Sequence, residues 1–379
     1  ENDFTFTGTA EVTKINASET AYPMGLKVED FTNTSKNFTN VTFKVTDGSL
    51  TINPVAIELT AKSTSKTYDG TPLTLNEYEI TGGKFVGDEG LATVTVEGSQ
   101  TLVGESANTI KAHTLKDNTK AQNYTITYQP SKLTVTENTT EIKITANSHT
   151  WEYDGQPHSD GGYTVEYNGQ TYTLAAGASA TLPTGDIVTA TVEGTVTNVA
   201  DSADDNNEVT GVVIKNAGGV DVKNQYQNIT TVNGGLKITV RGAGEMKVTL
   251  TAADHTVIYD GQAHGAKLNA AGQIAADVSY TITNLVKGHR VQTVAIDGSQ
   301  TAVGKYENEL VPSGAKIVDA NDNDVTVNYL VTYVKGNLEI TSPDTVIVTI
   351  KGHTSTVEYD GQKQEVNGYD VLSISNELY

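Results

Sequence analysis

Short stretches in which apolar and polar residues alternate recur along the whole chain. Four of them precede the same tripeptide, and they span residues 56–60, 141–145, 247–251 and 346–350. A period of two places successive side chains on opposite faces of a strand, so each stretch predicts a strand with one buried face. No stretch is rich in strong helix formers at a period of 3.6 residues. The pattern therefore predicts an all-β protein.

The tripeptide that follows these stretches is Tyr-Asp-Gly, and its copies lie 85, 106 and 100 residues apart. Glycine adopts a positive φ angle without steric cost and aspartate tolerates one, so Asp-Gly after a strand predicts a tight turn. The four copies are Tyr68-Asp69-Gly70, Tyr153-Asp154-Gly155, Tyr259-Asp260-Gly261 and Tyr359-Asp360-Gly361. A motif repeated at such intervals predicts a tandem array of similar domains.

Two further markers recur in the same order after the tripeptide. The middle marker is Gly-Asp or Gly-His, and its copies are Gly87-Asp88, Gly185-Asp186 and Gly288-His289. The closing marker is a pair of alternating stretches that begins at Tyr124 and again at Tyr329, with a looser copy at Tyr226. Two such stretches joined by a short turn predict a β-hairpin.

Three complete units follow from these markers, at residues 55–137, 138–241 and 242–342. Short strands with turn signals about every 8–12 residues, in units of roughly 100 residues, predict immunoglobulin-like β-sandwiches. The connections are short and none is a flexible Gly/Ser tether, so we expect tandem sandwiches in an elongated rod. The second unit is the longest, and we assign its excess to an extra hairpin or loop at residues 171–184.

The two ends of the chain carry complementary parts of one repeat. Residues 1–54 carry only middle and closing markers, and residues 343–379 carry only the opening strand and the Tyr-Asp-Gly turn. One half of a sandwich leaves the inner face of its sheet in water. We therefore expect residues 343–379 of one copy to pack with residues 1–54 of the next. Two interpretations remain: a period cut from a longer tandem array, or completion in trans by another copy.

Charge and composition narrow the class of protein. The chain has 379 residues, 46 Asp and Glu against 25 Lys and Arg, a formal charge of −21 and no cysteine. Phosphates would repel such a chain, so nucleic acid is not an expected partner. No window approaches 18 consecutive apolar residues, so membrane insertion is not expected either. The absence of cysteine excludes disulfides, thiolate nucleophiles and Cys-ligated metals.

The repeated motifs together resemble a known group of domains. The Tyr-Asp-Gly turn, the turn at residues 98–101 and the closing sequence at residues 328–340 are similar to bacterial Ig-like repeats called MBG and YDG-motif domains. Residues 24–48 resemble the closing half of the same repeat, so the resemblance covers essentially the whole chain. It implies an extracellular location, in secreted or cell-wall-attached bacterial proteins whose tandem repeats form stalks and adhesins. The family offers no established catalytic residues to transfer.

Two histidine pairs flank the tyrosines of the second and third turns at identical offsets. The pairs are His149 with His158 and His255 with His264. If the Asp-Gly turn closes a hairpin, both members of a pair lie on one face, where zinc or copper is conceivable. The other two copies of the motif lack these histidines and the sequence fixes no third ligand, so surface polar residues are the favoured interpretation.

An acidic loop in the third unit is a second candidate metal site. Asp319, Asp322 and Asp324 supply the carboxylate oxygens that calcium prefers. The loop falls inside a unit, immediately before a predicted strand, and a polar turn explains the same residues. The polar turn is the favoured interpretation.

The sequence predicts a structural protein and no enzyme. It contains neither Gly-x-Ser-x-Gly nor His-Glu-x-x-His, and no cofactor is expected. The leading hypothesis is a stalk or fibre segment that acts as a rigid spacer, with further copies of the repeat as its partners end to end. One alternative is an adhesin that binds host glycan or protein through repeat loops such as residues 171–184, in the unit that contains Tyr163, Tyr167 and Tyr172. The other is a head-to-tail fibre subunit completed in trans by strand complementation.

Overall fold

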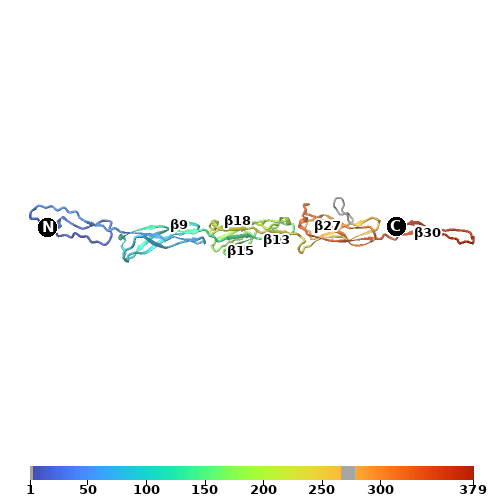
Figure 1. Cartoon of the computed structure of the whole chain (residues 1–379), viewed down its shortest axis with the longest axis horizontal. Helices are drawn as coiled ribbons and strands as arrows, with labels where there is room; N and C mark the ends of the chain where they lie inside the picture. Colours follow the sequence, from blue (N-terminus) through green and yellow to red (C-terminus); the bar gives the residue numbers. More distant parts are fainter. Residues whose placement is uncertain (1–2, 266–277) are drawn as a thin grey trace.

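The computed structural model describes residues 3–265 and 278–379, and strands dominate this part of the chain. Its helical residues form short 3-10 turns, with no α-helix among the described residues. The predicted all-β class is confirmed. Figure 1 shows the strands running along one long axis, from the blue N-terminal segment to the red C-terminal hairpin. None of the described helices is long and apolar enough to cross a membrane.

The names first, second and third unit are kept for residues 55–137, 138–241 and 242–342. The first unit has one sheet in the order β10-β5-β7 and another in the order β6-β11-β9-β8. Its elements are β5 (Val55–Ala61), β6 (Thr64–Thr67), β7 (Tyr78–Gly82), β8 (Leu91–Glu97), β9 (Gly104–Leu115), η2 (Ala121–Asn123), β10 (Tyr124–Gln129) and β11 (Ser131–Thr136).

The second unit has sheets in the orders β15-β14-β12-β19, β13-β20 and β16-β17-β18. Its elements are β12 (Ile142–Ala146), β13 (His149–Glu152), β14 (Tyr163–Tyr167), β15 (Gln170–Leu174), β16 (Ala180–Thr181), β17 (Ile187–Glu193), η3 (Val199–Asp201), β18 (Glu208–Lys215), η4 (Lys223–Gln225), β19 (Ile229–Val232) and β20 (Leu236–Thr239). The extra length includes β15, which forms a hairpin with β14 around Asn168 and Gly169, both at positive φ.

The third unit has sheets in the orders β24-β21-β28, β22-β29-β27-β25 and β23-β26. Its elements are β21 (Val248–Ala252), β22 (His255–Ile258), β23 (His264–Gly265), β24 (Tyr280–Thr283), β25 (Arg290–Asp297), β26 (Ser299–Gln300), β27 (Gly304–Val318), η5 (Thr326–Asn328), β28 (Val331–Val334) and β29 (Gly336–Thr341).

In each unit the opening stretch divides into two strands that belong to different sheets. In the first unit, β5 pairs in parallel with β10, and β6 pairs in parallel with β11. The second unit repeats both pairings through β12–β19 and β13–β20, and the third through β21–β28 and β22–β29. The chain therefore changes sheets just before the Tyr-Asp-Gly turn of each of the three units.

The predicted closing hairpin is wrong. β10 pairs with β5, whereas β11 lies between β6 and β9 in the other sheet. Pro130, which has no backbone N–H, stands between the two strands. The opening stretch gives each closing strand a parallel partner, which satisfies their backbone groups without a hairpin.

The two sheets of a unit enclose a common apolar core. In the first unit Ile57 and Leu59 come from one sheet and Val96 and Ile110 from the other, and all four are buried. The second and third units are built in the same way. Burial of each such side chain contributes about 1.5–3 kcal/mol, which makes these contacts the main stabilising term of a unit.

The segments at the two ends of the chain bury far fewer side chains than the three units do. Residues 3–54 contain β1 (Phe4–Phe6), β2 (Tyr22–Pro23), η1 (Val28–Asp30), β3 (Phe31–Asn33) and β4 (Ser49–Leu50). Residues 343–379 contain β30 (Val348–Gly352) and β31 (Tyr369–Ile374). Ala17 is the only buried apolar residue among 3–54, and none is buried among 343–379. Neither end has a core like those of the three units.

A buried asparagine joins the two sheets in the first and second units. Asn207 is fully buried, and its Nδ2 donates to the carbonyls of Asn147 and Asp160, each at 2.8 Å. Asn108 makes the same pair of contacts with Lys62 and Leu75, each at 3.0 Å. The first carbonyl in each pair lies where the opening stretch changes sheets. The side-chain amide therefore holds the chain at the point where the opening stretch passes from one sheet to the other.

We expect Asn207→Ala to lower the free energy of unfolding of the second unit by about 3 kcal/mol, because two partly buried carbonyls lose their donor. The single tryptophan, Trp151, lies on β13 of this unit and reports its unfolding by fluorescence in a denaturant titration. Gln227→Ala removes an exposed amide from the same unit and serves as the control. Equal unfolding midpoints for the two variants would contradict the assigned role of Asn207.

Candidate functional site: the junctions between units

The tyrosine of a Tyr-Asp-Gly turn leaves its own unit and enters the next one. Tyr68 belongs to the first unit, but it is only 2% exposed and packs in the core cluster of the second unit. Tyr153 of the second unit is also 2% exposed and packs in a cluster with Val248 and Ile317 of the third. The repeated tyrosine is therefore an element of the junction between neighbouring units.

In the first junction, Tyr68 meets a buried carboxylate and a second tyrosine. Its hydroxyl donates to Oδ2 of Asp186 at 3.0 Å, and the hydroxyl of Tyr226 donates to the same oxygen at 2.6 Å. The two rings meet edge to face, with centroids 5.7 Å apart at 84°. Burial raises the pKa of both tyrosines, and the negative charge of Asp186 raises it further. Both phenols are therefore neutral donors to the carboxylate.

The backbone of the turn lies close against residues of the second unit, which hold it in place. Nδ2 of Asn138 donates to the carbonyl of Tyr68 and to the hydroxyl of Tyr167, each at 2.9 Å. Gly70 has a φ of +79°, and a Cβ atom there would lie 2.1 Å from the carbonyl oxygen of Thr184. Any other residue at position 70 would push the two units apart.

The second junction repeats this arrangement with different polar residues. Tyr153 and Tyr329 meet edge to face, with centroids 5.5 Å apart at 81°. His289 takes the place of Asp186, and its Nδ1 lies 2.8 Å from the hydroxyl of Tyr329. Burial lowers the pKa of His289 and raises that of Tyr329 to about 12. Nη1 of Arg241 donates to the carbonyl of Tyr153 at 3.2 Å, the role that Asn138 has in the first junction.

A third contact is shared by both junctions. The residue just before the closing tyrosine accepts a hydrogen bond from a backbone N–H of the preceding unit. Oδ1 of Asn328 accepts from Val199 at 2.8 Å, and Oε1 of Gln225 accepts from Val103. The sequence predicted none of these polar partners, because they differ in residue type between the units. The recurring Gly-Asp and Gly-His marker was the available signal, since Asp186 and His289 belong to it.

The turn chemistry is common to all four copies of the motif. Oδ1 of each aspartate accepts from the N–H two residues later, at 2.9 Å in three copies and 2.8 Å after Asp260. The Lys66 side chain, which donates to Asp69, lowers the pKa of this aspartate to about 2. The environments of the tyrosines differ, however: Tyr259 is half-buried and Tyr359 is 96% exposed.

Three of the four candidate histidines contact an aromatic or acidic side chain. His149 and His158 stack on the two-ring system of Trp151, at centroid distances of 4.2 and 4.9 Å. Nε2 of His158 lies 2.9 Å from Oδ1 of Asp154, and Nε2 of His264 lies 2.7 Å from Oδ1 of Asp260. His255 lies on β22, half-buried. The described residues contain no group of three or more His, Asp or Glu side chains that could hold a metal ion.

The acidic loop forms a hydrogen-bonded turn. Asp319 accepts from the backbone of Asn321 and Asn323, at 2.8 and 2.9 Å. Asp322 pairs with Arg290, and Asp324 accepts from Thr326. The three carboxylates thus face separate partners.

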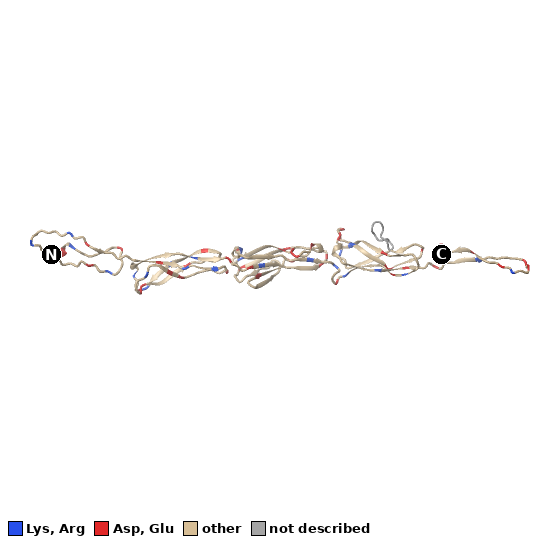
Figure 2. Ribbon diagram, viewed as in Figure 1, with Lys and Arg blue, Asp and Glu red and all other residues tan. Residues whose placement is uncertain are grey.

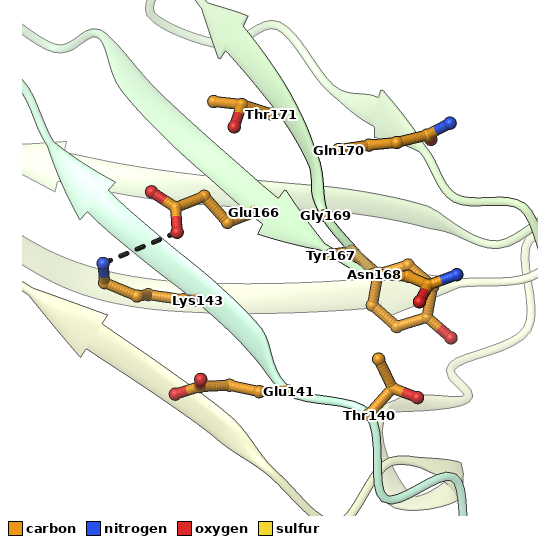
Figure 3. A pocket seen from close by; sticks show the side chains of 9 residues that line it. All are labelled: Thr140, Glu141, Lys143, Glu166, Tyr167, Asn168, Gly169, Gln170 and Thr171. Carbon is orange, nitrogen blue, oxygen red and sulfur yellow. Dashed lines mark ion pairs between the residues drawn. The ribbon is translucent and has the colours of Figure 1, made fainter.

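The hairpin that lengthens the second unit borders an open pocket of about 490 Å3 (Figure 3). Lys143 and Glu166, which face each other on the paired strands β12 and β14, form an ion pair beside it, with Nζ and Oε2 3.5 Å apart. Of the three tyrosines singled out for this unit, Tyr163 and Tyr167 are core residues, exposed by 0% and 5%. Tyr172 is half-buried, and its hydroxyl donates to Gln170 at 2.7 Å. The pocket is lined mainly by polar groups.

Comparison with known proteins gave no assignment: no family model matches the chain, and no curated protein matches it. The junctions therefore take their interpretation from the repeats within the chain. The two junctions are built in the same way from different residues, and this similarity is the evidence that they share a role.

We expect Tyr68→Phe to lower the free energy of unfolding of the second unit by about 1.5–3 kcal/mol, because a buried carboxylate loses one of its donors. The variant keeps the ring, so the loss reports the hydrogen bond to Asp186. Denaturant unfolding followed by Trp151 fluorescence measures it, with the half-buried Tyr172→Phe as the matched control. A Tyr68→Phe curve that overlays the control curve would show that this hydrogen bond stabilises nothing.

Proposed function

We propose that the chain is a structural stalk segment of a large secreted or cell-surface bacterial repeat protein. Its units are immunoglobulin-like β-sandwiches in tandem, and it acts as a rigid spacer. The observation that carries this proposal is the tyrosine junction, in which a side chain of one unit is buried in the core of the next. A spacer keeps its length only if neighbouring units do not bend freely against each other.

The connecting residues support a stiff arrangement. Asn138, between the first and second units, is 6% exposed, and its N–H donates to the carbonyl of Gln225 at 2.8 Å. Between the second and third units, the N–H of Arg241 donates to the carbonyl of Asn328 at 2.8 Å. Because these connections are hydrogen-bonded to the following unit, they do not behave as flexible tethers.

The distribution of charge also suits a spacer. Figure 2 shows acidic residues along the whole length of the molecule, interspersed with fewer basic ones. With a formal charge of −21, like charges keep neighbouring rods apart and in solution. The extracellular setting follows from the resemblance to surface repeats, in which cysteine-free sandwiches need no oxidant.

The placement of the ionisable groups favours a structural role over an enzymatic one. The buried Asp186 faces Tyr68 and Tyr226 inside the first junction, and His289 faces Tyr329 inside the second. A catalytic group must reach a substrate, whereas these groups are bonded to tyrosine hydroxyls at the junctions.

Adhesion to a host glycan or protein is a second candidate function, favoured by the pocket beside β14 and β15. This hairpin is the feature that lengthens the second unit, and Lys143 and Glu166 offer polar contacts there. If the pocket binds a glycan, the full chain will give hits on a glycan array that Glu166→Ala removes. A blank array for the full chain would discard this candidate.

The stalk function predicts that the tyrosines control the stiffness of the molecule. We expect the double variant Tyr68→Ala/Tyr153→Ala to adopt a broader range of shapes in solution, because both junctions lose their buried ring. Small-angle X-ray scattering will show a smaller radius of gyration and a smoothed cross-section signal. The control is Tyr78→Ala/Tyr172→Ala, which alters two tyrosines within units, and circular dichroism of both variants confirms retained strands. Unchanged scattering from a folded junction variant would refute the role in stiffness.

A further inference from the structure

The C-terminal hairpin exposes a strand edge that is covered in the complete units. In the third unit, β21 pairs with β24 on one edge and with β28 on the other. β30 corresponds to β21 and pairs with β31 as β21 does with β24, but its second edge has no strand partner in the described part of the chain. Residues 355–358, which correspond to β22, likewise form no strand there. Ile350 and Val357 on these stretches are each 56% exposed.

The N-terminal segment contains the sequence that covers these edges elsewhere. Asn37-Phe38 and Thr42-Phe43 resemble Asn123-Tyr124 and Thr127-Tyr128 at the start of β10, with one more residue between the two dipeptides. Leu50 and Ile52 then repeat the spacing of Leu133 and Val135 in β11. Residues 37–47 pair with no strand in the described chain, and Phe38 is 65% exposed, whereas Tyr124 is 8% exposed.

The first unit carries a junction socket that no Tyr-Asp-Gly tyrosine fills. The hydroxyl of Tyr124 donates to Glu89 and accepts from the N–H of Val86 at 3.0 Å, as that of Tyr329 bonds His289 and the N–H of Val286. Oδ1 of Asn123 accepts from the N–H of Ala17 at 2.9 Å, the contact made by Asn328 in the second junction. Beside Tyr124 lies a cavity of about 270 Å3, bordered by Ile52 and Val86.

We propose that the occupant of these edges and of this socket is a second copy of the same chain. Residues 37–53 of the second copy add the missing closing strands to residues 346–359 of the first. Tyr359 of the first copy then enters the socket beside Tyr124 and Glu89 of the second. This inference rests on the proposed stalk function, since it names the partner that extends the stalk.

The register of this contact follows from the pairings in the third unit. There Leu250 pairs with Tyr333, and Val257 pairs with Ile340, both in parallel. The equivalent pairs between copies are Val357 with Ile52 and Ile350 with Phe43, with the extra residue between Phe38 and Phe43 forming a one-residue bulge. In all three units the N–H of the turn tyrosine donates to the carbonyl that ends the closing strand, at 2.8 or 2.9 Å. The N–H of Tyr359 therefore meets the carbonyl of Asn53.

The interface between the third unit and the C-terminal hairpin contains an unfilled cavity. Tyr259, Pro343 and Leu378 border a cavity of about 210 Å3, and a Cβ atom on Gly261 would lie 3.0 Å from Leu378. In the complete junctions the corresponding place beside the turn tyrosine holds Tyr226 or Tyr329. Phe38 of the second copy fills this position, so one contact completes two junctions.

Sedimentation of the full chain over a range of concentrations tests the association. We expect dimers and longer end-to-end species, and an approximately tenfold or greater rise in dissociation constant for Tyr359→Ala and for Phe38→Ala. Both side chains are largely exposed in the single chain, so their removal leaves its fold intact. Tyr78→Ala is the control and keeps the wild-type constant. A chain that stays monomeric at about 1 mM, or variants that match the control, would overturn the proposal.

Cross-linking tests the register, because the chain has no cysteine of its own. Thr356 faces Thr51 between copies, as Thr256 faces Glu339 in the third unit. We expect Thr356→Cys chains mixed with Thr51→Cys chains to form a disulfide-linked heterodimer under a mild oxidant, since facing strand residues lie within disulfide reach. Thr356→Cys mixed with Thr32→Cys is the control and stays unlinked. Equal linking in both mixtures, or none in either, contradicts the register.

The scattering and sedimentation experiments separate the two proposals. Chains that stay monomeric but are stiff leave the stalk function standing and overturn the assembly. Chains that associate but bend freely at Tyr68 and Tyr153 overturn the stalk function and leave the contact between copies.

Discussion

The arrangement of this molecule depends on a single buried contact, the tyrosine that each complete junction inserts from one unit into the next. Its ring meets a second tyrosine edge to face, at 5.7 Å in one junction and 5.5 Å in the other. An aromatic side chain buries a large area with few rotatable bonds, and an edge-to-face pair adds directional preference. The same contact thus holds two units together and fixes the angle between them.

The polar partners of the tyrosines show how much variation this contact accepts. Asp186 is a charged acceptor for two hydroxyls, whereas His289 is a neutral ring whose pKa is lowered by burial. Both contact the hydroxyl of the closing tyrosine, whose second partner is the hydroxyl of Thr184 in the first junction and the N–H of Val286 in the second. The geometry of a junction therefore requires a hydrogen-bond acceptor at the position of Asp186 and His289. It does not require one particular residue type there.

The sequence predicted the repeated features and missed those that differ between units. Period-two alternation and the Tyr-Asp-Gly turns identified the opening strands, because local backbone chemistry determines them. The closing strands were misassigned as a hairpin, since alternation does not reveal whether neighbouring stretches pair with each other or with distant strands. Asn138 and Arg241 share a role but no chemical pattern, so only the folded chain could bring them to the same carbonyl position.

The parallel pairing of opening and closing strands links the fold to the proposed assembly. Each unit is closed by strands from its two sequence ends, so a unit can be divided into two segments that still match in register. Edges that match in this way are templates for β-strand addition. The terminal segments of this chain present two such edges, and their exposed aromatic residues correspond to buried ones in the complete units.

A double-mutant cycle between Tyr68 and Asp186 tests the central contact most directly. The free energy of unfolding of the second unit would be measured by Trp151 fluorescence for Tyr68→Phe, Asp186→Asn and the double variant. If the hydrogen bond couples the two units, the effects will be non-additive by at least about 1 kcal/mol. Strictly additive effects would mean that the two residues stabilise the second unit independently, and the account of the junction would be wrong.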